Sequence, residues 1–324
     1  MVIKTAQRKV NLIHPENGSV VVLVALLLTI LLGLSALVVD LGVIYVNYTH
    51  LQNTLDTAVL AGVQELPSST SKAQEVALQY AQDNGIAQVT ISFAQNDYEI
   101  NASVHGQVSA LFSKIWGLKE NTISASARAM MVTPSSITGA VPLSIQEQVL
   151  NFGTVYSLKS GAGDSTNGWF GPLALSGTGA NDYQTDLTYG YSGKLSIGQV
   201  LDLQSGDMSG PTKKAINSRM AADKKVPQNT YDDYERNAPE LVYVPIVKLL
   251  QTSGKVQIVG FAAFFLEGIT GNGTNSFIKG RFIRTIVING RSTGSLANLQ
   301  QSEAEMQEGQ LTSDFGLYAS KLLP

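Results

Sequence analysis

The sequence predicts an α+β protein: a long N-terminal helix that crosses a membrane, then a small α+β unit, then a β-rich domain. Three observations predict this order. Residues 20–39 form an uncharged apolar run, and helical periodicity continues beyond it to Pro67. Residues 72–133 mix a second helical pattern with alternating strand patterns. From Ala140 onward, short apolar segments are separated by glycine-rich turns.

The apolar run has the length of a membrane span. Twenty helical residues at about 1.5 Å each extend about 30 Å, which matches the hydrocarbon core of a bilayer. Lys4, Arg8 and Lys9 precede the run, and the positive-inside rule keeps such residues in the cytoplasm. A cleaved signal peptide would have a shorter core and a small-x-small cleavage site. We therefore expect a retained, single-pass anchor in the cell membrane, with the N-terminus cytoplasmic and the bulk of the chain extracytoplasmic.

Beyond Asp40 the helix becomes amphipathic. Its apolar residues recur at alternating spacings of three and four: Leu41, Ile44, Tyr48, Leu51, Leu55, Ala58 and Gly62. We take Ile44, Tyr48, Leu51 and Leu55 as candidate interaction residues. Two interpretations remain open, since this stripe could pack against the protein's own α+β unit or against neighbouring copies in a filament.

The small unit that follows combines a helix with a hairpin. The pattern predicts a helix over 72–83 opened by Ser71, and Asn84-Gly85 is typical of its left-handed cap. Strands are expected at 88–93 and 98–105, joined by a turn at Asn96-Asp97. A short amphipathic segment at 109–118 and a strand at 122–133 complete the unit.

A linker at 134–136 precedes the β-rich domain. One helix fits between Pro211 and Ala222, with proline at its first position, and residues 258–266 predict a strand buried on both faces. Residues 314–323 fit a strand or a short docking helix. The other expected strands are 141–145, 153–158, 173–175, 195–197, 241–247, 256–266 and 277–288. The predicted division is 1–18 (cytoplasmic basic segment), 19–66 (transmembrane and stalk helix), 67–133 (small α+β unit) and 134–324 (β-rich extracytoplasmic domain).

Composition excludes several function classes. Charged residues make up 15% of the 324 residues and the net charge is −3, so no broad basic field supports nucleic-acid binding. Cysteine is absent, which excludes disulfides, thiol catalysis and cysteine-ligated zinc. We expect no cofactor and no nucleic-acid partner.

No catalytic constellation emerges from the sequence. The histidines His14, His50 and His105 are scattered, and His14 falls on the cytoplasmic side of the predicted span. The sequence contains no H-E-x-x-H, G-x-S-x-G, Walker A or G-x-G-x-x-G pattern. We predict that the protein is not an enzyme and name no catalytic residue.

The best polar cluster lies in glycine-rich loops and comprises Asp164, Asn167, Asp182 and Asp186. Calcium favours oxygen ligands of this kind, but the spacing fails the EF-hand pattern. Asp and Asn beside Gly more commonly form turns, so we predict no metal site here. Trp169 and Phe170 are a candidate contact patch, with core filling as the alternative.

One stretch carries a specific family pattern. Residues 17–66 contain an apolar helix followed by Val39-Asp40-Leu41-Gly42, Leu51-Gln52, Asp56-Thr57-Ala58 and Leu60-Ala61-Gly62. This order resembles the TadG/TadE-like Flp pilus assembly family. Residues 112–117 and 123–129 are similar to the end of the first extracytoplasmic unit of such proteins, and residues 167–218 to a C-terminal region of some Gram-positive members. The resemblance implies that the small unit is pilin-like, with a sheet against the stalk helix.

Two family features are missing. Processed pilins carry Glu five residues after the cleaved Gly, whereas Leu23 stands five residues after Gly18, so we expect no processing there. No D-x-S-x-S metal motif of a von Willebrand A domain occurs.

Together these observations predict a membrane-anchored, minor-pilin-like structural or assembly component of a Tad-type pilus apparatus. The expected partners are the lipid bilayer and other pilus or secretion-apparatus subunits. The alternative is a tethered cell-surface protein whose β-rich domain binds a ligand or glycan.

Overall fold

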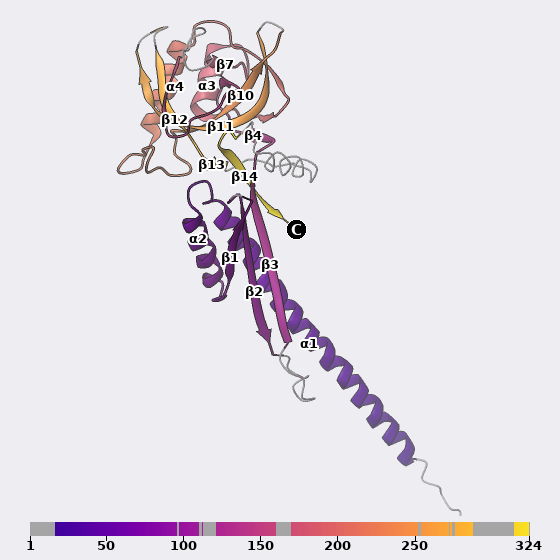
Figure 1. Ribbon diagram of the computed structural model, residues 1–324. Coiled ribbons are helices and arrows are strands. Elements are labelled where there is room, and N and C mark those ends of the chain that lie inside the picture. The colour runs from indigo at the N-terminus through magenta and orange to yellow at the C-terminus, as the bar shows by residue number, and fades with distance from the viewer. Residues whose placement is uncertain are drawn as a thin grey trace, which may run out of the picture. The chain divides into compact units, whose positions relative to one another are not determined.

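The structure is a computed structural model that describes residues 17–95, 97–109, 112, 121–159, 170–251, 254–271, 273, 276–287 and 314–323. The chain forms two compact units. The first comprises Met1–Asn53 with Val104–Ala125, and the second comprises Thr54–Ser103 with Ser126–Pro324. The fold is α+β, which confirms the predicted class. Figure 1 labels the elements of both units.

Helix α1 (Asn17–Val63) is one continuous helix, which confirms the long N-terminal helix. The next helix, α2 (Thr70–Asp83), begins earlier than the sequence predicted, because Ser69 rather than Ser71 accepts the backbone N–H of Lys72 as the N-cap. Three alanines at four-residue spacing are fully buried on α2: Ala73, Ala77 and Ala81. Gly85 closes the helix at a φ of 83°, as the left-handed cap requires.

The hairpin and the following strand appear as predicted. Strands β1 (Thr90–Ala94) and β2 (Glu99–Val108) pair antiparallel, and β3 (Asn121–Val132) follows them. The amphipathic segment at 109–118 falls outside the described residues, apart from Ser109 and Phe112.

The small sheet contains a strand from the far end of the chain. Its order is β1-β2-β3-β14-β13, and β14 (Leu317–Leu323) pairs antiparallel with β3, so that Ala319 lies opposite Val132. The short strand β13 (Thr285–Ile286) pairs parallel with the beginning of β14. The C-terminal segment is therefore a strand rather than a helix. The proposed division into segments stays a prediction.

A second sheet of seven strands forms the β-rich region. Its main order is β6-β12-β11-β10-β5-β7, and β9 pairs with the start of β11. The central hairpin joins β10 and β11 antiparallel, with a register shift between Ile246 and Val247. The strands are β5 (Leu143–Gln146), β6 (Val155–Lys159), β7 (Phe170–Pro172), β9 (Val200–Asp202), β10 (Leu241–Leu249), β11 (Lys255–Thr270) and β12 (Phe277–Ile283). A separate pair joins β4 (Ser136–Thr138) to β8 (Lys194–Ser196).

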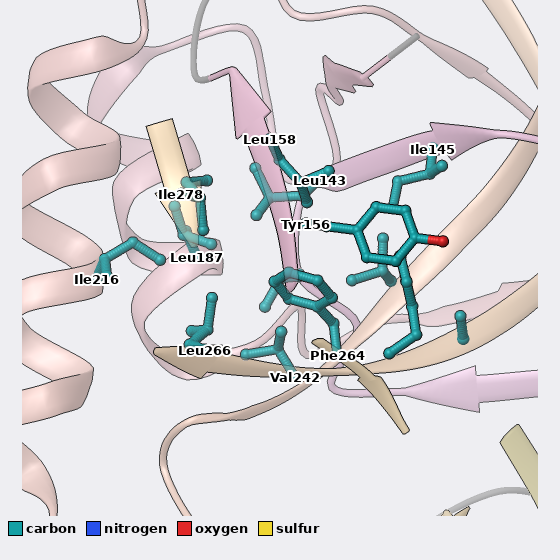
Figure 2. Close-up of a cluster of buried hydrophobic side chains, with 14 of the residues drawn as sticks. Leu143, Ile145, Tyr156, Leu158, Leu187, Ile216, Val242, Phe264, Leu266 and Ile278 are labelled. Atoms are coloured by element: carbon teal, nitrogen blue, oxygen red, sulfur yellow. The ribbon is translucent and has the colours of Figure 1, made fainter. Parts of the chain in front are cut away.

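Strand β11 is buried on both faces along residues 260–266, as the apolar run predicted. Side chains of alternate residues point to opposite faces of the strand, so they pack in two different cores. Ala262, Phe264 and Leu266 belong to a core that also contains side chains of both helices of this region, and Figure 2 shows those side chains converging on Phe264 and Leu266. Phe261, Ala263 and Phe265 belong to the opposite core, together with Leu317 and Ala319 of β14.

Two helices cover the first of these cores. Helix α3 (Ala180–Tyr189) was not predicted, and it buries Tyr183 and Leu187. Helix α4 (Ser209–Ala222) was predicted, but Pro211 is its third residue rather than its first. The Asp207 carboxylate accepts the Ser209 N–H at 2.9 Å in the turn that leads into the helix, whose N-cap residue is Met208. Proline is still accommodated in the first turn, where its missing N–H costs no helical hydrogen bond.

Candidate functional site

The apolar run of α1 is exposed along its length. Between Val20 and Val39 every large apolar side chain is exposed, from 44% at Val39 to 69% at Val38. The two hydroxyls in this stretch are satisfied within the helix: Thr29 donates to the Ala25 carbonyl and Ser35 to the Leu31 carbonyl, each at 2.8 Å. A helix that satisfies its own polar groups and exposes only apolar surface fits a single-pass membrane anchor.

Asp40 ends the apolar run and is buried, with 6% of its surface exposed. Its two carboxylate oxygens lie 3.0 Å and 3.3 Å from the backbone nitrogen of Phe112, which donates to them. The neighbours Val39 and Leu41 are exposed. Asp40 therefore binds Phe112 to the helix, which gives a physical role to the aspartate of the V-D-x-G pattern. Gly42 has no atoms within 4 Å of where a β-carbon would stand, so packing does not explain this glycine.

The four candidate interaction residues of the stripe differ in burial. Tyr48 is 43% exposed, Ile44 and Leu51 are half-buried, and Leu55 is fully buried. The Leu51 side chain lies against Gly106 of β2, because a β-carbon there would be 3.1 Å from Leu51 Cδ1. Contact with another subunit stays a prediction for the four residues, and Tyr48 has the surface for it.

The last turns of α1 are tightly packed. Leu55, Ala58, Val59 and Val63 have no exposed surface. A β-carbon added at Gly62 would lie 2.7 Å from Ile100 Cδ1 and 2.8 Å from the Ala73 carbonyl oxygen, so only glycine lets α1 approach α2 and β2 this closely. This contact explains the glycine of the L-A-G pattern.

A polar cluster follows the end of α1. Arg236 donates to the Gln64 side-chain oxygen and pairs with the Glu65 carboxylate, both at 2.5 Å. The second Glu65 oxygen lies 3.3 Å from Lys72 Nζ. These groups line a polar hollow of about 280 Å³ with Asp232 and Asp233. Sequence reasoning missed Arg236, since nothing in a local pattern links residues about 170 positions apart.

The aspartates of the glycine-rich loops serve the local backbone where they are described. Asp186 is buried and accepts the N–H and hydroxyl of Ser176 at 3.1 Å and 2.7 Å, and Asp182 lies in the first turn of α3 beside Gly177. Asp164, Asn167 and Trp169 fall outside the described residues, as does the side chain of Phe170. Among the described residues, no group of three potential metal-binding side chains occurs.

One buried charged pair lies beside the helix-covered core. Arg219 donates from Nε to the Leu187 carbonyl at 2.6 Å and from Nη1 to the Pro239 carbonyl at 2.8 Å. Burial lowers the pKa of Arg219 to about 10, and burial raises the pKa of Glu240, which is 1% exposed. These bonds tie α3 and α4 to the segment before β10. Their role is structural, since both partners are backbone carbonyls.

The match with known proteins falls on the helix described above. Residues 18–65 match the family model for putative Flp pilus-assembly TadE/G-like proteins. This confirms the resemblance of the N-terminal helix, and the matched family is a structural and assembly family. No curated protein and no solved structure matches the chain. The resemblance of residues 167–218 stays a prediction.

Proposed function

We propose that this protein is a membrane-anchored, minor-pilin-like component of a Tad-type pilus apparatus, in which it has a structural or assembly role. The observation that carries the proposal is the overlap between the TadE/G-like match at residues 18–65 and α1. Within that overlap, Asp40 accepts the Phe112 backbone N–H and Gly62 allows the close approach of Ile100 and Ala73.

The proposed orientation places the N-terminus in the cytoplasm and the bulk of the chain outside. Its support is the basic residues Lys4, Arg8 and Lys9 before the apolar run. Because the chain has no cysteine, single-cysteine variants report topology without background. On intact cells a membrane-impermeant maleimide should label Val149→Cys, whose parent residue is 88% exposed, and should not label Thr5→Cys. The reverse pattern would overturn the orientation.

The pilus role is tested by deleting the gene in the producing organism. We expect the loss of surface filaments under the electron microscope, and their return with the full chain but not with a chain lacking residues 20–39. Normal filaments combined with lost binding to glycans or wall polymers would instead support the tethered ligand-binding protein.

Mass spectrometry of the membrane-extracted chain should find residues 1–18 retained, apart from the initiator Met, whereas an N-terminus at Ser19 would indicate pilin-type processing.

A further inference from the structure

A hollow on the surface of α1 lies next to the segment that follows β2. Its volume is about 420 Å³, and it is lined mainly by apolar and small side chains. Phe112 lines it from the β2 side. The helix contributes Thr29, Leu32, Gly33, Ser35, Ala36 and Val39. Gly33 has no side chain and Ala36 has a small one, so the helix surface is indented there and leaves this space beside the Phe112 ring.

The position of the hollow along the helix places it within the proposed span. From Val39 back to Thr29 it covers eleven residues, whose ten helical steps rise about 15 Å. Asp40, whose carboxylate accepts the Phe112 backbone N–H, directly follows the bilayer-length run. The ring of Phe112 therefore lies at the end of the span, where a wholly apolar ring gains by entering the hydrocarbon.

The Asp40 carboxylate and the Phe112 backbone N–H are paired with each other, as polar groups in a medium with little water must be. A carboxylate at the edge of the hydrocarbon core is costly without partners, and so is an unpaired backbone N–H. Asp40 and the Phe112 N–H satisfy each other at 3.0 Å. The side chains that remain outward are apolar: Leu32 is 66% exposed and Phe112 is 40% exposed.

We propose that Phe112 is a second membrane contact, in which its ring enters the bilayer and a lipid acyl chain fills the hollow between the ring and α1. The proposal rests on the membrane span of the proposed function. Lipid is the occupant because the hollow continues the lipid-facing surface of α1 without interruption, and because the two hydroxyls in its lining, those of Thr29 and Ser35, already donate to backbone carbonyls of the helix. Asp40 acts as a positioning residue that holds Phe112 at this depth.

Spin-label accessibility in vesicles of phosphatidylcholine and phosphatidylglycerol tests this on the full chain. Nitroxides are attached to the single-cysteine variants Phe112→Cys, Leu27→Cys and Val149→Cys, and collisions with oxygen are compared with collisions with a water-soluble nickel chelate. Leu27→Cys, on the lipid-facing run, should favour oxygen several-fold, and Val149→Cys should favour nickel. We expect Phe112→Cys to favour oxygen, as Leu27→Cys does.

The outcomes separate this inference from the proposed function. If Phe112→Cys favours nickel while Leu27→Cys favours oxygen, position 112 lies in water and the second contact is wrong, although the anchor stands. Low accessibility of Phe112→Cys to both reagents would mean that protein, such as the helix of a second copy, covers position 112 instead of lipid. If Leu27→Cys itself favours nickel, the anchor fails together with the inference. Ser109→Cys, exposed on the same segment, gives the same readout if Phe112→Cys does not reconstitute.

Discussion

The two halves of helix α1 are both apolar, yet their side chains have opposite surroundings. Between Val20 and Val39 the large side chains are exposed, whereas Leu55, Val59 and Val63 have no exposed surface. The first half is apolar all round, so no single face can pack against a protein core. The second half carries its apolar residues on one stripe, with the polar residues Asn53 and Thr57 exposed on other faces.

This difference shows that hydrophobicity alone does not decide burial within a folded chain. An apolar cylinder is suited to lipid, which solvates it on every side. An apolar stripe beside polar residues is suited to a sheet and a second helix, which cover one side. Asp40 stands where one pattern changes into the other. Each of the predictions below tests how far the stability of the protein depends on the packing of the second half of α1.

The largest effect is expected from a charge placed in the packed half. Leu55→Asp would bury an unpaired carboxylate and lose a fully buried side chain, which should lower the free energy of unfolding by about 3–5 kcal/mol. The matched control is Tyr45→Asp on the same helix, where the parent side chain is 70% exposed. Thermal unfolding of the full chain in detergent measures both variants. Equal stability of Leu55→Asp and the wild type would mean that another subunit, rather than this chain, covers the stripe.

A smaller effect is expected from adding one methyl group at either of two glycines. Gly62→Ala forces a β-carbon to within 2.7 Å of Ile100 Cδ1, and such overpacking should cost about 1–3 kcal/mol. Gly42→Ala meets no atom within 4 Å and removes a helix-weakening glycine, so it should be neutral or stabilising by up to about 1 kcal/mol. Denaturant midpoints of the two variants should move in opposite directions. A shift of the same sign would contradict the close approach at Gly62.

The smallest effect concerns the polar end of the packed half. Arg236→Ala removes the ion pair with Glu65 and the bond to Gln64, and because the arginine is 45% exposed the loss should be about 1 kcal/mol or less. Lys248→Ala, an exposed lysine on β10, is the control and should change stability less. The difference between the two should shrink at high salt, since screening weakens exposed pairs. A salt-independent difference would point to packing of the arginine stem instead.

Local patterns predicted the elements of this protein well where the pattern was long or strong. The apolar run, the hairpin and the doubly buried strand β11 were each readable from period and length. Helix α3 was missed because its apolar stripe within residues 180–189 has few members, chiefly Tyr183 and Leu187, among turn-forming residues.

The candidate site was only partly predictable, because a local pattern does not show which of its side chains the fold covers. The stripe at Leu51 and Leu55 came from helical spacing, but nothing local distinguished the exposed Tyr48 from the buried Leu55. Asp40 carried a family pattern without an evident role, because its partner Phe112 is 72 residues away.

The sequence by itself determined the long helix and its apolar run of membrane-spanning length, since both follow from residues that are near one another along the chain. An uncharged run of bilayer length needs no distant partner to define it. Only the tertiary structure decided which half of α1 is covered, that β14 joins the sheet of β3, and that Arg236 binds Glu65. The physical reason is that burial, strand pairing and ion pairing are formed between segments far apart in the chain. Local periodicity gives each segment an apolar face or an unpaired edge, but the partner that satisfies it is selected by the packed fold.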